Sequence, residues 1–406
     1  MARVILHCDL NSFYASVELL NHPELRHLPV AVCGDPASRK GIILAKNEPA
    51  KAFGVKTAET IWQAKQKCPD LVLLPPHHDR YAEYSHLINT IYGQYTDLVE
   101  PFGIDESWLD ITGSMHLFGG DAASIADSIR HRISSELGLT LSVGVSFNKV
   151  FAKLGSDYRK PDATTLISPE NWREIVWPLP VGSLLFAGPA AQRILAQYGI
   201  RTIGQLAAAD RDLAYRLLGK LGLQLWNYAN GLDEAPVRPQ HEKEPVKSVG
   251  NSFTFKENLT NRDQVRRGIS LLCDSVATRL RQQGLYCGAV QIGIKDASFH
   301  SISRQKHLPH STHLMRELLE ASMDLVDQVW QAPSPIRLLN VTALDLTDRW
   351  ETYEQVDLFA PQQPVIDGKR ERLEQAMDTI RSKYGDKAIS FGDVPACASE
   401  ITPEQT

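Results

Sequence analysis

The sequence predicts a multidomain protein of the α+β class. Its 406 residues exceed what a single hydrophobic core usually supports, so we expect two to four domains. In the first part of the chain, short apolar runs alternate with segments of helical periodicity. A helical region follows, and a second block of strands and helices begins near Lys247.

The first block begins with a predicted buried strand over residues 4–9, which ends in the carboxylate of Asp9. The predicted elements that follow are an amphipathic helix through Phe13, Val17 and Leu20, strands at 29–33 and 41–45, helices from Glu59, at 81–96 and at 122–137, and a strand at 139–146. This order predicts a mixed sheet with helices on one face, interrupted by a small insert.

Short helices are predicted throughout residues 168–232. Ser168 and Pro169 indicate the first helix start, because serine is a good N-cap and proline fits the first turn. The polar, proline-rich stretch 233–245 is interpreted as a linker.

The second block is predicted to be a compact βαββαβ unit. Its predicted elements are a strand to Phe255, a helix at 262–283, strands at 286–294 and 300–308, a helix at 312–330 and a strand at 336–346. A last helix at 364–384 is rich in charge and is predicted to be mostly solvent-facing.

Charge is distributed unevenly along the chain. The formal net charge is -5, yet residues 236–310 carry 12 Lys and Arg against 6 Asp and Glu. A basic part joined to an acidic body is typical of proteins that bind a nucleic-acid backbone, and a solvated charged face is the alternative.

The composition excludes several classes of protein. Six cysteines are scattered without a C-x-x-C pair, no secretory start is present, and no apolar run reaches the roughly 20 residues that span a bilayer. We therefore expect a cytoplasmic protein without structural zinc and without a membrane partner.

Three carboxylates suggest the chemistry. Asp9 ends the first strand, and Asp105 and Glu106 follow Gly103 at the start of an apolar, strand-like run. Carboxylates at neighbouring strand ends are suited to two Mg²⁺ ions, which catalyse phosphoryl transfer by stabilising the attacking and leaving oxygens. A lone aspartate is more often a helix cap or a surface charge, but three carboxylates in such contexts favour a metal site.

Residues 9–18, 102–110 and 142–154 together resemble motifs of the Y-family translesion DNA polymerases, of the DNA polymerase IV type. The resemblance runs in order from residue 1 to about 350. It implies a right-hand polymerase with a ferredoxin-like palm at 1–10 and 77–167, small fingers at 11–76, a helical thumb at 168–232, a linker at 233–245, a βαββαβ little finger at 246–349 and a tail at 350–406.

The resemblance implies an error-prone, template-directed DNA polymerase that acts in translesion synthesis and DNA repair. Asp9, Asp105 and Glu106 match the family's metal-binding carboxylates, which hold two Mg²⁺ ions with the backbone carbonyl of Leu10 as a further ligand. The implied partners are primed DNA template and deoxynucleoside triphosphates, and the protein is expected to be a monomer.

The nucleotide site is also implied by the resemblance. Tyr14 matches an aromatic steric gate, whose ring would clash with a ribose 2′ hydroxyl; core packing is the alternative. Phe13 is assigned to the same site, although from the residues alone it is expected to point the other way, into the core. Lys51 and Lys160 match positions that contact the triphosphate.

One part of the predicted fingers departs from the family pattern. Ala45, Glu48 and Lys51 stand where the family commonly shows Thr, Tyr and Arg. A carboxylate at Glu48 would repel phosphate unless it faces away or meets Lys46. Lys51 keeps the positive charge but lacks the two-pronged geometry of an arginine.

The sequence also offers candidate residues for contact with DNA and with a sliding clamp. The candidates for contact with DNA lie in the basic part of the chain and are Lys247, Ser248, Arg266, Arg267, Arg304 and Lys306. Residues 355–359 resemble a peptide that binds the sliding clamp, with Gln355, Leu358 and Phe359 as the contacting side chains.

Two other functions remain open from the sequence. A nucleotide cyclase can share a palm-like sheet with paired aspartates, but it would not need a basic βαββαβ domain or a clamp peptide. A catalytically weak accessory protein of the same family that binds DNA ends is suggested by Ala45, Glu48 and Lys51.

Overall fold

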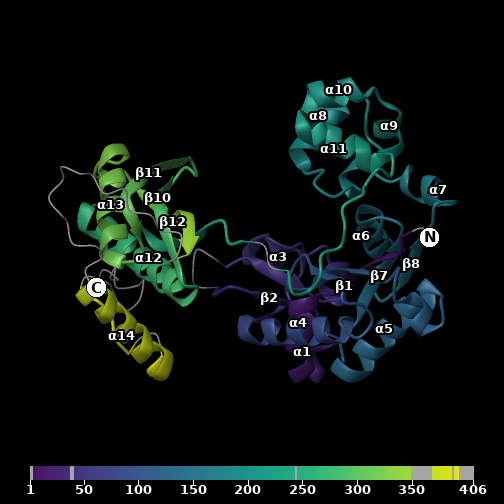
Figure 1. Cartoon of the computed structure of the whole chain (residues 1–406), viewed down its shortest axis with the longest axis horizontal. Helices are drawn as coiled ribbons and strands as arrows, with labels where there is room; N and C mark the ends of the chain where they lie inside the picture. Colours follow the sequence, from purple (N-terminus) through teal and green to yellow (C-terminus); the bar gives the residue numbers. More distant parts are fainter. Residues whose placement is uncertain (1–2, 37–40, 243–244, 349–367, 386–387, 393–406) are drawn as a thin grey trace. The chain divides into compact units, whose positions relative to one another are not determined.

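The structure is a computed structural model that describes residues 3–36, 41–242, 245–348, 368–385 and 388–392 (Figure 1). It divides into two compact units, Met1–Pro36 with Gly41–Lys243, and Glu244–Thr406. Each unit is described by itself.

The first unit is built around a five-stranded sheet with the strand order β5-β6-β1-β7-β8. The central strand β1 runs antiparallel to β6 and to β7, whereas β7 and β8 are parallel. The strands are β1 (Ile5–Leu10), β5 (Val99–Pro101), β6 (Glu106–Asp110), β7 (Leu141–Ser146) and β8 (Thr164–Ile167).

Helices cover both faces of this sheet, and the prediction of helices on one face was wrong. Leu6 and Leu10 of β1 pack in one core with α4 (His78–Tyr92) and α5 (Ala122–Leu137). Ile5 clusters with Ala152 of α6 (Lys149–Tyr158) on the other face. All six residues of β1 are buried, which only a strand covered on both sides allows. In Figure 1, α5 and α6 lie on opposite sides of β7.

Gly144 permits the close packing of α6 on the sheet. A Cβ atom at this position would lie 1.9 Å from the carbonyl oxygen of Ala152 and 2.4 Å from the backbone nitrogen of Ser156. Only glycine allows the two backbones to approach this closely. The position of α6 matters for the site described below, because Lys153 of α6 and Lys160 just after it pair with two of the site's carboxylates.

A second, small sheet has the order β3-β2-β4. Its elements and the helices beside it are α1 (Phe13–Asn21), η1 (Pro23–Leu25), β2 (Val30–Cys33), β3 (Ile43–Lys46), α2 (Glu48–Ala52), α3 (Ile61–Lys67) and β4 (Val72–Leu74). Asn47 ties α2 to β2, since its side-chain oxygen accepts hydrogen bonds from the N–H groups of Ala50 at 3.1 Å and Val30 at 2.9 Å. The start of α2 is therefore fixed in place.

The predicted helical region is confirmed as helical. It contains α7 (Trp172–Val176), η3 (Val181–Ser183), α8 (Pro189–Gln197), α9 (Ile203–Ala208), α10 (Arg211–Leu218) and α11 (Lys220–Ala229), and η2 (Met115–Phe118) precedes α5. The first helix begins at Trp172 rather than near Ser168. The Asn171 side chain instead accepts the N–H of Ser168 at 2.8 Å, which closes a turn before the helix.

The first part of the predicted linker lies against the first unit. Arg238 and Lys149 both pair with the buried carboxylate of Glu100, at 3.1 and 2.8 Å. The N–H of Gln240 donates to the carbonyl of Asp97 at 3.2 Å. These contacts fix the segment up to about residue 240 along β5 and the start of α6.

The second unit has the predicted order of elements. They are β9 (Val249–Leu259), α12 (Arg262–Gln282), β10 (Leu285–Asp296), β11 (Ser301–Thr312), α13 (Met315–Val329) and β12 (Ile336–Asp348), in a sheet of order β11-β10-β12-β9. Apolar side chains of α12 and α13 form one core with this sheet. The βαββαβ prediction is confirmed.

The last helix, α14 (Gly368–Tyr384), is mostly solvent-facing, as predicted, but one side of it is docked on the second unit. Glu371, Glu374, Met377 and Arg381 on one side of the helix are buried. Arg281 of α12 contacts Glu374 and reaches Asp378 at 2.6 Å. Nothing in the sequence indicated this docked side, whose charged residues Glu374, Asp378 and Arg381 pair with α12.

The structure also bears on membrane insertion and on the cysteines. Among the described residues, no helix combines the length and the apolar character needed to cross a membrane. The five cysteines that lie in the described ranges are buried and free.

Docking of α14 should depend on Arg281, whose side chain is 5% exposed. Replacing one partner of a buried ion pair leaves unpaired charge and costs about 3–5 kcal/mol. We predict that Arg281→Met speeds amide hydrogen exchange in α14 by about 100-fold or more.

A matched control is Arg262→Met, because Arg262 pairs with Asp327 on the exposed surface. Exchange in α14 should be unchanged in this control. Equal protection of α14 in the Arg281→Met variant and in the original protein would contradict the assigned role of the buried pair.

Candidate active site

The pairing of β1 with β6 brings together the carboxylates that the sequence singled out. Asp9 lies directly opposite Glu106, and the N–H of Leu10 donates to the carbonyl of Asp105 at 3.1 Å. Opposed residues of an antiparallel pair place their side chains on one face of the sheet. Asp9 and Glu106 therefore share a face.

One cavity of about 450 Å³ collects every residue predicted for catalysis, metal binding and nucleotide binding. These residues are Asp9, Leu10, Phe13, Tyr14, Lys51, Asp105, Glu106 and Lys160. Ser12, Ala45 and Lys46 also line it.

Lysines pair with the two opposed carboxylates. Lys160 Nζ lies 2.6 Å from Asp9 Oδ2 and 2.8 Å from Asp157. Lys153 of α6 lies 2.6 Å from Glu106 Oε2. Nothing in the sequence around Lys153 indicates Glu106 as its partner.

Burial and these contacts shift the pKa values of Asp9 and Glu106 in opposite directions. Burial raises the pKa of Asp9 to about 7, although the charge of Lys160 opposes the shift. Burial acts in the same sense on Glu106, but contacts with His7 and Lys153 outweigh it and bring its pKa to about 2. Burial and the charge of Glu106 raise the pKa of Asp105. Glu106 is thus firmly ionised, while Asp9 is easily neutralised.

The oxygen donors suit a hard divalent cation, because carboxylates and carbonyls are the ligands that Mg²⁺ prefers. Within the described ranges, however, no three His, Cys, Asp or Glu side chains are already grouped as metal ligands. Oxygens of Asp9 and Glu106 are engaged by Lys160 and Lys153. The residues fit a cation, and a bound cation would displace these lysines from the carboxylate oxygens.

Tyr14 is held by a network that the sequence interpretation missed. Its ring stacks on Tyr81 with centroids 3.9 Å apart and planes 14° apart. The Tyr81 hydroxyl donates to Glu18 at 2.5 Å, and His77 lies 3.0 Å from the same carboxylate. Glu18 is one helical turn after Tyr14, but a buried role for a carboxylate there had no signal in the sequence. Phe13, by contrast, is only 3% exposed.

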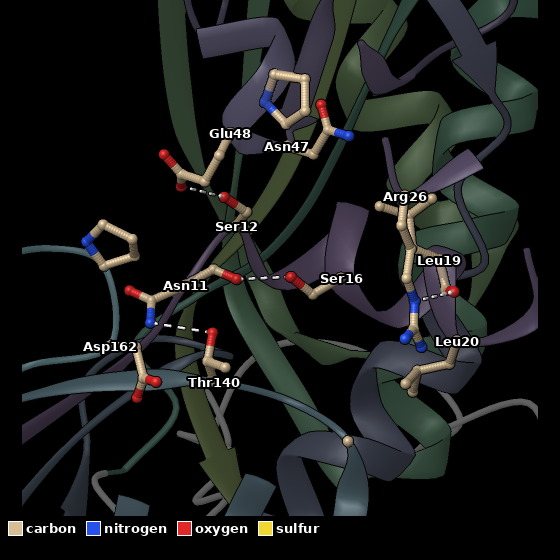
Figure 2. Close-up of a pocket in the computed structure, with 13 residues that line it drawn as sticks. Asn11, Ser12, Ser16, Leu19, Leu20, Arg26, Asn47, Glu48, Thr140 and Asp162 are labelled. Atoms are coloured by element: carbon tan, nitrogen blue, oxygen red, sulfur yellow. Dashed lines mark hydrogen bonds between the residues drawn. The ribbon is translucent and has the colours of Figure 1, made fainter. Parts of the chain in front are cut away.

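The Glu48 side chain is half-exposed, and its partners are Lys51 and Ser12 rather than Lys46. Its Oε1 atom lies 2.5 Å from Lys51 Nζ and accepts a hydrogen bond from the Ser12 hydroxyl at 3.3 Å. Lys46 donates instead to Thr57 at 2.8 Å. Glu48 lines an adjoining cavity of about 400 Å³, and Figure 2 shows its carboxylate directed toward Ser12.

The residues predicted to contact DNA lie on β11, on α12 and just before β9. Arg304 and Lys306 lie opposite Ile292 and Val290, whose side chains are buried toward the helices. Lys306 accordingly pairs with Asp324 of α13 at 2.9 Å. Arg266 and Arg267 belong to α12, and Lys247 and Ser248 precede β9.

The other face of this sheet carries neutral polar residues that the sequence interpretation missed. Gln291 lies opposite both Gln305 and Thr342, so a row of polar side chains crosses β11, β10 and β12 and ends at Gly250 of β9. The alternation of polar and apolar residues in 285–296 could have indicated this open face. The clamp candidates Gln355, Leu358 and Phe359 lie outside the described residues.

Comparisons with known proteins follow the same division of the chain. Residues 8–157 match the impB/mucB/samB family, and residues 246–358 match the C-terminal domain of the impB/mucB/samB family. The two matches cover the three carboxylates and the whole βαββαβ unit.

Curated relatives match over nearly their full length. The chain is 46% identical to DNA polymerase IV of Acetivibrio thermocellus over 395 residues, which cover 97% of each protein. It is 39% identical to DNA polymerase IV 1 of Bacillus subtilis over 391 residues, which cover 96% of this chain and 93% of the relative.

The fold is similar to that of a solved Y-family DNA polymerase chimera. The superposition has a TM-score of 0.74 and covers 85% of this chain and 99% of the chimera, at 21% sequence identity. At that identity the likeness concerns the fold.

Proposed function

This chain belongs to the impB/mucB/samB family and is a translesion DNA polymerase of the DNA polymerase IV type, and we propose that Asp9, Asp105 and Glu106 are its catalytic metal ligands. The observation that carries the proposal is the β1–β6 register, which sets Asp9 opposite Glu106 in the cavity that also holds Asp105 and Tyr14.

Membership of this family implies dependence on a divalent metal ion. We propose two Mg²⁺ ions, held by the three carboxylates and the backbone carbonyl of Leu10. When bound, they would lower the barrier for attack of a primer 3′ hydroxyl on the α-phosphate and stabilise the departing pyrophosphate.

Lys160 and Lys153 pair with carboxylates of the cavity, and Lys160 has two successive roles in this proposal. Without substrate, Lys160 and Lys153 compensate the charge of Asp9 and Glu106. Once those carboxylates act as ligands, Lys160 is free to bind the triphosphate as a point charge. Its tether at the end of α6, next to Asp157, keeps it at the cavity rim.

Tyr14 is proposed to select the sugar. Its ring borders the cavity and is fixed against Tyr81, so it cannot swing away without breaking the stack. A rigid ring beneath the incoming sugar excludes a 2′ hydroxyl by contact rather than by attraction. Phe13 lines the cavity but packs mainly in the core.

The substrates of a DNA polymerase are a DNA template and deoxynucleoside triphosphates, and we assign the grip on duplex to the second unit. We propose that its open polar face and its basic residues share this role. We further propose error-prone copying by a monomer in the cytoplasm, with residues 355–359 binding the sliding clamp.

The two rival functions are less well supported. Full-length relatives that are named DNA polymerase IV do not favour an accessory protein. A nucleotide cyclase would have no use for the βαββαβ unit, which matches the family's C-terminal domain.

Asp105→Asn should abolish synthesis while leaving the fold intact. Loss of a metal ligand removes several kcal/mol of transition-state stabilisation, so we expect a drop of about 1,000-fold in single-turnover extension of a primed template. Asp212→Asn, on the exposed surface of α10, is the control and should extend normally. Primer extension at the original rate by the Asp105→Asn variant would contradict the assignment of Asp105 as a metal ligand.

Tyr14→Ala should admit ribonucleotides. We expect the preference for deoxynucleotides, measured as a ratio of kcat/KM values, to fall by about 10–200-fold. Tyr81→Phe keeps the supporting ring and is expected to retain most of the discrimination. An unchanged ratio in Tyr14→Ala would show that another group excludes the 2′ hydroxyl.

Deletion of residues 355–359 tests the clamp proposal. We expect loss of clamp-stimulated synthesis on primed circular template, with clamp-free synthesis unaffected. Equal loss of both activities would indicate a structural role for the segment and refute the proposal.

A further inference from the structure

Glu48 occupies a fixed position beside the nucleotide cavity. It is the first residue of α2, and the buried Asn47 before it anchors that helix to β2 through the N–H of Val30. Its carboxylate accepts from the Ser12 hydroxyl at 3.3 Å and lies 2.5 Å from Lys51 Nζ (Figure 2 shows the bond to Ser12).

Both partners of Glu48 belong to the nucleotide cavity, but Glu48 itself does not line it. Ser12 and Lys51 border the space shared with Asp9 and Asp105, whereas Glu48 lines the adjoining cavity. The carboxylate therefore contacts Ser12 and Lys51 from the adjoining cavity and not from the nucleotide cavity. The Ser12 hydroxyl donates to Glu48 and does not cap α1, and the Ser12 backbone is left-handed with φ 54°.

Lys51 differs from the other paired lysines of the site. Lys160 and Lys153 are paired with Asp9 and Glu106, which the proposed function assigns to the metal ions. Metal binding would release those two lysines. Glu48 is not among the proposed ligands, so its hold on Lys51 persists when the metal ions are bound.

Resting on the proposed function, we propose that Glu48 is a positioning residue that competes with nucleotide phosphates for Lys51. The triphosphate gains Lys51 only by displacing the carboxylate. After transfer, the carboxylate takes Lys51 back, which favours release of pyrophosphate. Glu48 thus weakens nucleotide binding and pyrophosphate binding together.

The size of the effect follows from exposure. The side chains of Lys51 and Glu48 are 36% and 49% exposed, and such ion pairs are weak and sensitive to salt. We expect Glu48→Gln to lower the Kd for deoxynucleotide by about two- to fivefold at low ionic strength, and less at high salt.

The test is a double-mutant cycle on the full-length protein with primed template and Mg²⁺. Single-turnover titrations give the nucleotide Kd separately from the rate constant for Glu48→Gln, Lys51→Ala, the double variant and the original chain. We expect Glu48→Gln to lower the Kd with little change in rate constant, and to tighten inhibition by inorganic pyrophosphate by a similar factor.

The cycle separates competition from other effects. If Glu48 acts through Lys51, the gain from Glu48→Gln disappears when Lys51 is already alanine. Glu136→Gln is the matched control, because Glu136 pairs with Arg132 in an exposed helical pair on α5. Its nucleotide Kd should equal that of the original chain.

Three results would overturn the inference: an unchanged Kd in Glu48→Gln, a gain that persists without Lys51, or a gain that Glu136→Gln reproduces. Each leaves the proposed function standing so long as the original chain extends primers and Asp105→Asn does not. If the original chain fails to extend primers in Mg²⁺, the proposed function fails first.

Discussion

The antiparallel pairing of β1 with β6 is the constraint on which the site depends. Side chains alternate between the two faces of a sheet, so a register shift of one residue would send Glu106 to the face opposite Asp9. Several features hold the register. β1 is buried along its whole length between α6 and the α4–α5 pair, Gly144 lets α6 approach the sheet, and His7 contacts Ser156 of α6 at 2.8 Å.

Opposite charges are balanced at the cavity. Asp9 and Glu106 each face a lysine, and the two carboxyl groups respond differently, since the pKa of Asp9 is raised to about 7 and that of Glu106 is lowered to about 2. In the proposed function, incoming cations and phosphates would replace the lysines and carboxylates that these groups now contact. Glu48 adds a pair of another kind, because its partner Lys51 is a proposed nucleotide contact while its own carboxylate is not a proposed metal ligand.

Much of this fold could be predicted from the sequence, because its elements are strongly periodic. The α5 helix has the predicted bounds, and the βαββαβ order was recovered, since apolar spacing identifies a helix such as α12 without knowledge of its neighbours. Tertiary pairing was not predictable in the same way. Nothing local shows that Lys153 meets Glu106, that Glu18 supports Tyr81 beneath Tyr14, or that Arg281 pairs with Glu374 of α14. Those partners are far apart in the chain.

The most direct measurement is the number and coupling of Mn²⁺ ions in a complex of the protein with primed template and an unreactive deoxynucleotide analogue. Electron paramagnetic resonance should show two spin-coupled Mn²⁺ ions per chain, about 3.5–4 Å apart, and the coupling should vanish in Asp9→Asn. A single uncoupled ion, or a coupled pair that survives in Asp9→Asn, would contradict the account.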